Sequence, residues 1–309
     1  MHIIHTASEL DRGAKGVCVA IGVFDGVHLG HEQVIRQMVA DARQQEALSI
    51  VITFDRHPNV IVAPGSIPPL IYSLPQRLRA INALGVHATL LIRFDEPFSR
   101  QSGEQFIRGL VRDFGHVHSI CVGSSFSFGH KRSGNLAVLR KFGQELNFTV
   151  HGLAAVALDS EVVSSTRIRE AIRGGKLDLA GQMLGRGYSL AGVVVRGDKL
   201  GRQLGFPTAN IDTAGLILPP TGVYAVHATI QNKVHRAVLN LGFRPTLGSD
   251  TPQLRVEAHL FNFSDDIYGE ELELTFVQKI REEKKFPSLE ALQQQIVQDV
   301  AAAKNSFGK

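Results

Sequence analysis

The arrangement of apolar residues changes once along the chain, and this change limits the folds that the chain can adopt. Between residues 17 and 174, apolar strand-like runs alternate with amphipathic helix-like segments. After residue 187, runs of β-branched and aromatic residues follow one another with only turns between them. The alternation predicts a parallel sheet covered by helices, whereas consecutive short strands predict an antiparallel barrel. We therefore expect an α/β domain over residues 1–183 and a β-barrel domain over residues 184–309.

The expected elements follow from these two patterns. In the first half, strands are predicted at 17–21, 48–54, 88–94, 118–122 and 148–155, and helices at 76–84, 103–114 and 136–142. An earlier helix begins near residue 29, and its buried face carries Val34, Ile35, Met38, Val39 and Ala42. In the second half, strands are predicted at 191–195, 223–230, 236–241, 254–261 and 271–277. A helix at 289–303 closes the chain, with a stripe of Leu289, Leu292, Ile296, Val297 and Val300.

The composition excludes several classes of protein. The 309 residues are 44% hydrophobic, which allows each half to bury a core. The formal net charge of +4 comes from scattered lysines and arginines, and the chain has no Trp, so we expect small anionic ligands rather than nucleic acid. The N-terminus lacks a signal-peptide layout and no apolar run reaches membrane-spanning length. We therefore expect a cytoplasmic protein that binds no membrane and is a monomer or a weak oligomer.

The two cysteines lie inside apolar strand-like runs. Cys18 belongs to the first predicted strand and Cys121 to the fourth. Cysteine in such a run is a small apolar residue of the core, and disulfides are rare in a reducing compartment. We expect two buried thiols and no disulfide.

A glycine-rich turn follows the first predicted strand. It reads GVFDGVHLGH over residues 22–31, and its two histidines, His28 and His31, lie three positions apart at the start of a helix. The carboxyl end of a strand in an open α/β sheet and the N-terminus of a helix both favour anionic ligands. Gly30 has no Cβ to block a ligand, and both imidazoles face one side of the first helical turn. The segment predicts a phosphate site, although so short a pattern also arises by chance.

A second polar segment, SSTRIR at residues 164–169, opens another predicted helix. Hydroxyl and guanidinium groups at a helix start are suited to binding phosphate. Taken alone, the segment is more simply a helix cap followed by a solvated basic helix. The two histidines of the first segment are too few to hold zinc, so we expect no metal site there.

Together, the two segments resemble the HxGH nucleotidyltransferase superfamily, and FDGVHLGH at 24–31 followed by SSTRIR is similar to the FMN adenylyltransferase module. The resemblance implies a Rossmann-like nucleotidyltransferase domain that transfers the adenylyl group of ATP to FMN, which forms FAD and releases pyrophosphate. His28, His31 and Arg167 would stabilise charge on the α-phosphate, and Mg²⁺ would bind the phosphates. His57 and Phe126 would contact the flavin. The residues that would bind ATP in this domain are Gly22, Phe24, Asp25, Gly30, Ser164, Ser165 and Thr166.

The barrel half contains a second candidate loop, GDKLGRQLGFPTAN at residues 197–210. Its glycines allow the loop to fold over phosphates, and Lys199 and Arg202 supply positive charge. Thr208 and Asn210 carry hard oxygens that suit Mg²⁺ or its water shell. The loop is not a P-loop, because the Gly-Lys-Ser/Thr sequence is missing. Taken by itself, it is also consistent with a long hairpin loop.

Four separated runs in this half resemble riboflavin kinase. They are GFPTAN at 205–210, GVYAV at 222–226, EAHLF at 257–261 and KIREEKKF at 279–286. The whole chain therefore resembles the bifunctional riboflavin kinase/FAD synthetase family. The resemblance implies phosphorylation of riboflavin to FMN by ATP, with Mg²⁺. The residues that would bind ATP and Mg²⁺ are Lys199, Gly201, Thr208 and Asn210, of which Thr208 and Asn210 would contact the metal.

Two further residues of the barrel half have an alternative interpretation. By resemblance, Glu257 is the general base on the ribityl 5′-hydroxyl of riboflavin, a role for which a carboxylate is chemically suited. Without the resemblance, Glu257 is more simply an outward-facing, solvated strand residue. Arg281 is either a contact to the flavin or a phosphate, or a member of a surface salt bridge.

Three segments depart from the family's pattern. Three serines, Ser124, Ser125 and Ser127, stand where acidic residues and an arginine are common. Arg56 replaces a usual proline, and Asn262 replaces a usual aspartate. We therefore expect an intact kinase and an adenylyltransferase that binds FMN differently.

Two other hypotheses stay open at this point. In one, the first domain adenylylates another phosphorylated or carboxylated acceptor, and the barrel binds a ligand without catalysing a reaction. In the other, the chain is a flavin or nucleotide carrier. A carrier leaves the paired histidines and Glu257 without a purpose.

Overall fold

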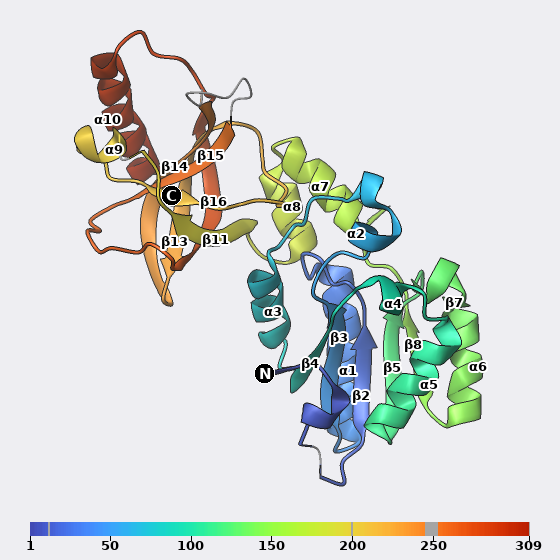
Figure 1. Ribbon diagram of the computed structural model, residues 1–309. Helices are drawn as coiled ribbons and strands as arrows, with labels where there is room; N and C mark the ends of the chain where they lie inside the picture. Colours follow the sequence, from blue (N-terminus) through green and yellow to red (C-terminus); the bar gives the residue numbers. More distant parts are fainter. Residues whose placement is uncertain (12, 199, 245–252, 309) are drawn as a thin grey trace. The chain divides into compact units, whose positions relative to one another are not determined.

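The computed structural model describes residues 1–11, 13–198, 200–244 and 253–308 (Figure 1). These residues form two compact units, Met1–Ser165 and Thr166–Lys309, which we call the sheet unit and the barrel unit. The barrel unit begins before the predicted domain boundary at residue 184, because it includes α7 (Ser165–Arg173) from Thr166 onward and all of α8 (Leu177–Leu184). Leu177 of α8 packs against the barrel core.

The sheet unit contains the predicted parallel sheet. Its six strands lie in the order β1-β4-β3-β2-β5-β8, and every neighbouring pair is parallel. The sequence analysis missed β1, whose three residues are too few to show a pattern. The strands are β1 (His2–Ile4), β2 (Val17–Ile21), β3 (Leu48–Phe54), β4 (Ala88–Ile92), β5 (Val117–Gly123) and β8 (Thr149–Leu153).

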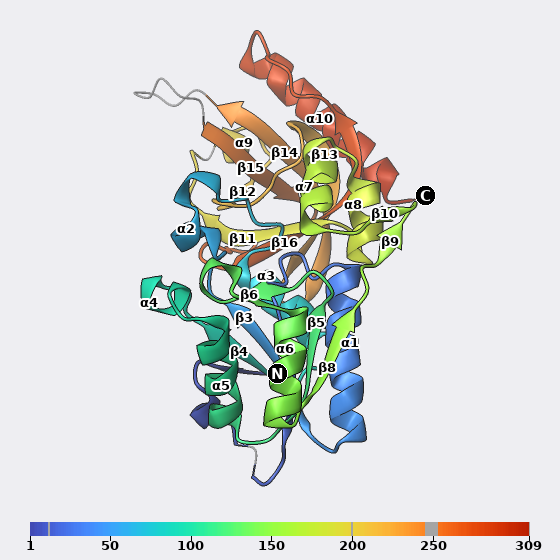
Figure 2. The same ribbon diagram turned by 90° about the vertical axis from the view of Figure 1, so that its right-hand side faces the viewer.

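Helices cover both faces of this sheet, as Figure 2 shows. Successive strand residues face opposite sides, so Val17, Val19 and Ile21 pack on one face, and Cys18 and Ala20 on the other. The first face is covered by α5 (Gly103–Phe114) and α6 (Leu136–Leu146). The second face is covered by α1 (Leu29–Gln44) and α3 (Leu74–Asn82). The predicted buried face of α1 is confirmed.

The cysteine prediction is also confirmed, because Cys18 and Cys121 are both buried and neither is in a disulfide. Burial raises the pKa of both thiols. Short elements complete the unit: η1 (Ala7–Glu9), α2 (Asn59–Val62), η2 (Pro64–Ser66), α4 (Glu96–Ser99), β6 (Ser127–Phe128), η3 (His130–Arg132), β7 (Gly134–Asn135), β9 (Ala157–Leu158) and β10 (Glu161–Val162).

The barrel unit contains the predicted antiparallel barrel. Its strands close in the order β11-β12-β15-β14-β13-β16, and the core includes Leu190, Tyr224 and Leu239. The three-residue strand β12 was not predicted; it begins in the last two residues of the segment 197–210 that was interpreted as a loop. The strands are β11 (Ser189–Val195), β12 (Ala209–Ile211), β13 (Gly222–Ile230), β14 (Lys233–Arg244), β15 (Gln253–Leu260) and β16 (Glu271–Arg281).

Two helices lie against the outside of the barrel, α9 (Leu200–Gln203) and α10 (Leu289–Ser306) (Figure 1). The predicted stripe of α10 is wrong in part, because Leu289 and Val297 are each 54% exposed. The helix instead buries Asp299 and Ala303, which rotates its inner face away from Val297. Among the described residues, no helix has both the length and the apolar character needed to cross a membrane.

Candidate active sites in the two units

The turn between β2 and α1 lies at the carboxyl end of a central strand. β2 has β3 on one side and β5 on the other, and the chain leaves it in a strained conformation. Phe24 and Val27 have φ angles of 52° and 42°, which L-residues rarely adopt. Strain of this kind persists where the surrounding structure holds it, and it is common at binding sites.

The two histidines of the turn lie side by side, as expected. His28 caps the N-terminus of α1, and its Nδ1 accepts a hydrogen bond of 3.4 Å from the backbone N–H of His31. The two imidazole rings are stacked with centroids 3.6 Å apart, and Phe24 contacts His31 edge-on. A Cβ on Gly30 would lie 3.3 Å from Cε1 of His28, so glycine leaves this stack undisturbed. The arrangement places two imidazoles and a helix N-terminus at one point.

Other predicted ATP-binding residues surround this turn. Gly22 follows β2 directly, and its N–H donates to the carbonyl of Ile52 in β3. Asp25 is only 2% exposed, and its carboxylate accepts hydrogen bonds from the backbone N–H groups of Ile71 and Tyr72. The Asp25 side chain therefore holds the turn against the segment before α3.

The second predicted segment reaches the same turn through Ser165. Its hydroxyl donates a hydrogen bond of 3.1 Å to the backbone carbonyl of Asp25. Ser164 is half-buried, whereas Thr166 is exposed. Arg167 follows on α7 and belongs to the barrel unit.

The predicted flavin contacts follow the two strands that flank β2. His57 comes after β3, and its Nδ1 accepts a hydrogen bond from the backbone N–H of Asn59. Phe126 comes after β5 and stacks on Phe128 at 5.2 Å. Because the strands are parallel, their carboxyl ends lie along the same edge of the sheet as the histidine turn. Three exposed serines, Ser124, Ser125 and Ser127, accompany Phe126.

Asp55 and Arg56 form a local pair at the end of β3. The guanidinium of Arg56 donates two hydrogen bonds to Oδ2 of Asp55, and the N–H of Phe94 donates to Oδ1. Burial acts to raise the pKa of the Asp55 carboxyl, but these hydrogen bonds outweigh it, so the pKa lies below its usual value. Arg56 thus has a partner, and the carboxylate of Asp55 ties the end of β3 to the segment that follows β4.

The sequence analysis missed Arg77, a buried arginine of α3. It is 3% exposed, and it donates hydrogen bonds to the backbone carbonyls of Val23 and Phe54. Burial lowers the pKa of its guanidinium, and Asp25 and Asp55 act in the opposite direction. The available signal was its helical position four residues before Ile81, which places a charge on an apolar face.

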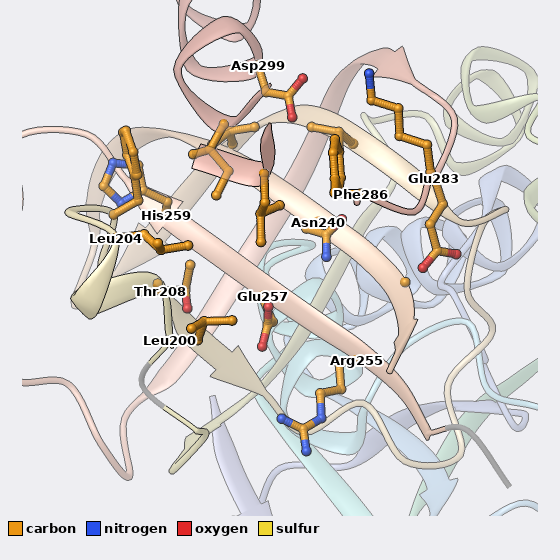
Figure 3. A pocket seen from close by; sticks show the side chains of 18 of the residues that line it. Leu200, Leu204, Thr208, Asn240, Arg255, Glu257, His259, Glu283, Phe286 and Asp299 are labelled. Atoms are coloured by element: carbon orange, nitrogen blue, oxygen red, sulfur yellow. The ribbon is translucent and has the colours of Figure 1, made fainter. Parts of the chain in front are cut away.

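In the barrel unit, the predicted residues converge on a cavity of about 260 Å³ on the outside of the barrel (Figure 3). In the sheet register, Glu257 of β15 lies opposite Asn210 of β12 on one side and Asn240 of β14 on the other. Their neighbours Ala209, Leu239 and Ala258 point into the barrel core, so these three side chains face outward. Glu257 is thus an outward-facing strand residue that lines a cavity.

The cavity is walled by segments outside the barrel ladder. Leu204 and Thr208 line one side, and Phe286 lines the other, with Glu257 between them (Figure 3). Gly201 also lines the cavity. Gly201 permits a close approach, since a Cβ there would lie 2.4 Å from the carbonyl of Phe206. Of the predicted residues, Gly201, Thr208, Asn210, Glu257 and Arg281 all line this cavity. Lys199 lies outside the described residues.

Arg281 forms a salt bridge, but the pair is largely buried rather than on the surface. Its Nε and Nη2 donate to the two oxygens of Asp299 at 2.8 and 2.6 Å, and the side chains are 20% and 6% exposed. Gln295 also donates to Asp299. The pair joins the end of β16 to α10, and both residues line the cavity.

Three further cavity residues were missed by the sequence analysis. Asn240 could not be found from a local motif, because only the register of β14 against β15 places it beside Glu257. Asp299 lies three residues after Ile296 and four before Ala303 on α10, so a charge on the same helix face as apolar residues was the available signal. Glu283 accepts a hydrogen bond from the N–H of Phe243 and so ties the segment after β16 to β14.

A second cavity of about 330 Å³ shares Thr208 with the first. Arg202 and Tyr268 line it, together with the carboxylates of Asp265 and Asp266. The oxygens of Thr208, Asn210 and Glu257 are hard donors of the kind that Mg²⁺ prefers. Among the described residues, no group of three or more His, Cys, Asp or Glu side chains could hold a metal ion.

The fold and the two sites define a class: a two-site transferase, with an anion-accepting turn on a parallel sheet and a carboxylate-centred cavity on a barrel. Comparison with known families agrees. Residues 11–167 match the FAD synthetase family, and residues 184–307 match the riboflavin kinase family. The chain belongs to the bifunctional riboflavin kinase/FMN adenylyltransferase family.

Named relatives cover the whole chain. The bifunctional riboflavin kinase/FMN adenylyltransferase of Haemophilus influenzae is 36% identical over 308 residues, which cover 99% of each chain. The protein of the same name from Escherichia coli K12 is 34% identical over 306 residues, 99% of this chain and 96% of the relative. A solved structure titled a macrolide-efflux protein from Streptococcus pneumoniae has a TM-score of 0.81 at 29% identity, with 98% of both chains covered.

Proposed function

We propose that the barrel unit phosphorylates riboflavin to FMN in the Glu257 cavity, and that the histidine turn of the sheet unit takes part in the adenylylation of FMN to FAD. Riboflavin kinase and FAD synthetase activities are those of the chain's family. The observation that carries the residue assignment is the convergence of Gly201, Thr208, Asn210, Glu257 and Arg281 on one cavity.

In the kinase reaction, the ribityl 5′-hydroxyl of riboflavin attacks the γ-phosphate of ATP, and ADP leaves. Phosphoryl transfer of this kind depends mainly on positioning and charge stabilisation, with one group that accepts the hydroxyl proton. Glu257 is the proposed acceptor, because its carboxylate faces the cavity between two asparagine side chains. ATP would extend from Thr208 toward the second cavity, since Thr208 lines both.

Mg²⁺ is part of this proposal. Thr208 and Asn210 would hold it together with the ATP phosphates, and it would supply positive charge that offsets the charge of the transferred group. Arg281 would contact the flavin through guanidinium protons that neither Asp299 nor the backbone carbonyl of Glu282 engages. Its orientation is set by two hydrogen bonds to that carboxylate.

In the adenylyl transfer, a phosphate oxygen of FMN attacks the α-phosphorus of ATP, and pyrophosphate leaves. His28, His31 and the N–H groups at the start of α1 would donate hydrogen bonds to the α-phosphoryl oxygens. Arg167 would add positive charge from α7. His57 and Phe126 would contact the flavin from the two neighbouring strand ends.

The wider assignment follows from these reactions. The product of the first reaction is a substrate of the second, so one chain with two ATP sites would convert riboflavin to FAD. We assign residues 1–183 to adenylyl transfer and 184–309 to the kinase, where the match to the riboflavin kinase family begins. A cytoplasmic location is supported by two buried cysteines, neither in a disulfide. We propose a monomer or weak oligomer that needs neither nucleic acid nor membrane.

The test is chromatography of the flavins formed when the purified protein is incubated with riboflavin, ATP and Mg²⁺. We expect FMN to appear first and then to give way to FAD. Accumulation of FMN without FAD would contradict the adenylyltransferase assignment, whereas unchanged riboflavin would contradict the kinase assignment. FMN supplied directly with ATP separates a failed second reaction from a failed first one.

A further inference from the structure

The buried guanidinium of Arg77 joins the turn after β2 to the last residue of β3, beyond the last backbone hydrogen bond between these two strands. The parallel ladder between β2 and β3 ends at the pair Ile21 and Ile52. Beyond it, Gly22 donates one more backbone hydrogen bond, to Ile52. Past that point, Arg77 donates from Nη1 to the carbonyl of Val23 and from Nη2 to the carbonyl of Phe54.

The two carbonyls belong to segments with different proposed substrates. Val23 lies in the turn that leads to His28, where the α-phosphate of ATP would bind. Phe54 is the last residue of β3, three residues before His57, the proposed flavin contact. Arg77 therefore connects the proposed nucleotide side of the site to its flavin side.

A second contact holds α3 against the same turn. The carboxylate of Asp25 accepts hydrogen bonds from Ile71 and Tyr72, which precede α3 directly. The turn is thus tied to the start of the α3 segment through Asp25 and to α3 itself through Arg77. This closed arrangement fixes the guanidinium relative to the strained turn.

We propose that Arg77 is a positioning residue for adenylyl transfer: its guanidinium sets the spacing between the turn that holds the α-phosphate of ATP and the strand end that holds the flavin. The inference rests on the proposed function of the sheet unit. In-line transfer between two bound substrates requires near-contact of the reacting atoms, and a misplacement of about 1 Å can cost about 100-fold in rate.

The chemistry of the site favours this role over simple stabilisation. A buried guanidinium is costly, and the Nε of Arg77 has no hydrogen-bond partner among the described residues. An apolar side chain of similar size would avoid both costs. A planar fork can hold two carbonyls at a fixed separation, whereas the compact ammonium of lysine cannot.

The experiment compares Arg77→Lys and Arg77→Met with the wild-type chain. The Kd of ATP with Mg²⁺ and the Kd of FMN are measured separately by calorimetry, and adenylyl transfer is measured in a single turnover with both substrates saturating. We expect both Kd values to stay within about threefold in each variant. We expect the transfer rate to fall about 10- to 100-fold in both. The barrel unit also binds ATP and FMN under the proposed function, so the titrations are fitted with two sites, and circular dichroism of each variant reports that the chain is folded.

Controls separate positioning from other effects. Arg100→Lys changes an arginine that pairs with Glu96 at the surface, and it should leave the transfer rate unchanged. Arg77→Lys could keep the full transfer rate while Arg77→Met loses it. The buried positive charge would then matter, and the two hydrogen bonds to the carbonyls of Val23 and Phe54 would not. That result overturns the inference. A loss of ATP affinity in proportion to the rate would also overturn it, because Arg77 would then act on the nucleotide alone.

A milder variant covers the case in which the Arg77 variants do not fold. Thr53→Val removes the hydroxyl that donates to the same carbonyl of Val23 and changes the side-chain shape little. We expect about a threefold loss of transfer rate with unchanged Kd values. An unchanged rate in Thr53→Val, beside unfolded Arg77 variants, would make Arg77 a structural residue only. If the wild-type chain transfers no adenylyl group to FMN, the proposed function itself fails, which is a distinct result.

Discussion

The two units build their candidate sites from different chemical groups. In the sheet unit, the site consists largely of backbone: strand ends, a strained turn and the start of a helix, with His28 and His31 added to it. In the barrel unit, the site consists of side chains that face outward from the strands, with Glu257 between Asn210 and Asn240. The difference indicates that the first site should be sensitive to the position of the backbone, and the second to the identity of single side chains.

The two units also differ in what their largely buried arginines, Arg77 and Arg281, bind. Arg77 donates to two backbone carbonyls, whereas Arg281 is paired with the carboxylate of Asp299. The first arginine joins segments of main chain, and the second joins a strand end to a helix. These differences between the two units lead to the predictions that follow.

The largest expected effect is at Glu257. Glu257→Gln keeps the size of the side chain and removes its basicity, so kcat for riboflavin phosphorylation should fall about 10²- to 10⁴-fold. Adenylylation of FMN by the same variant should not change. Both rates are measured by flavin chromatography. Glu290→Gln, at an exposed position of α10, is the matched control, and a kinase that survives Glu257→Gln would remove the general base from the account.

The next effect concerns the stability of the barrel unit. Asp299→Ala leaves the guanidinium of Arg281 largely buried without its carboxylate, so the free energy of unfolding should fall by about 3–5 kcal/mol. Urea unfolding measures the change. Glu282→Ala removes the exposed partner of Lys279 and should cost under about 1 kcal/mol. Equal losses in the two variants would show that burial of the pair has no energetic consequence.

A smaller effect is expected at the serine segment of the sheet unit. Ser125→Asp introduces an acidic side chain on an exposed loop beside Phe126. If this loop contacts the flavin, the KM for FMN should change several-fold while the KM for ATP does not. Steady-state rates of FAD formation measure both constants. An unchanged KM for FMN would remove the loop from the flavin site.

The smallest effect is a pH dependence at Asp55. Its carboxyl has a lowered pKa in the folded chain, so its ionised form stabilises the fold above the unfolded pKa of about 4. That contribution is lost as the pH falls through the lower folded pKa. The wild-type chain should therefore be more stable than Asp55→Asn at pH 7, with a difference that disappears under acid. A difference that does not vary with pH would contradict this.

Much of the fold was predictable because the local spacing of apolar residues indicates where strands and helices form. The strands at β2 and β3 and the helix α5 begin and end where the sequence pattern predicts. The short strands β1 and β12 were not predictable, because three residues show no alternation. The inner face of α10 was mispredicted near Val297, since the helix buries Asp299 to meet Arg281.

The site residues also fall into those that could be predicted from local sequence and those that could not. Residues in contiguous motifs, such as His28 and Thr208, could be found from the sequence and from the family resemblance. Residues that complete the sites through distant contacts could not: Asn240 is placed by strand register, and Arg77 by carbonyls that precede it by 54 and 23 positions. For Arg77, a charged residue on the buried face of a helix was the available local signal.

The most direct test of two separate sites in one chain is a mixing experiment. Glu257→Gln and His31→Asn are purified and supplied with riboflavin, ATP and Mg²⁺, first separately and then together. We expect Glu257→Gln alone to leave most of the riboflavin unconverted in the time that the wild-type chain needs to form FAD, His31→Asn alone to stop at FMN, and the mixture to form FAD. A mixture that forms no FAD, or a His31→Asn variant that also loses the kinase, would contradict the assignment of one reaction to each unit.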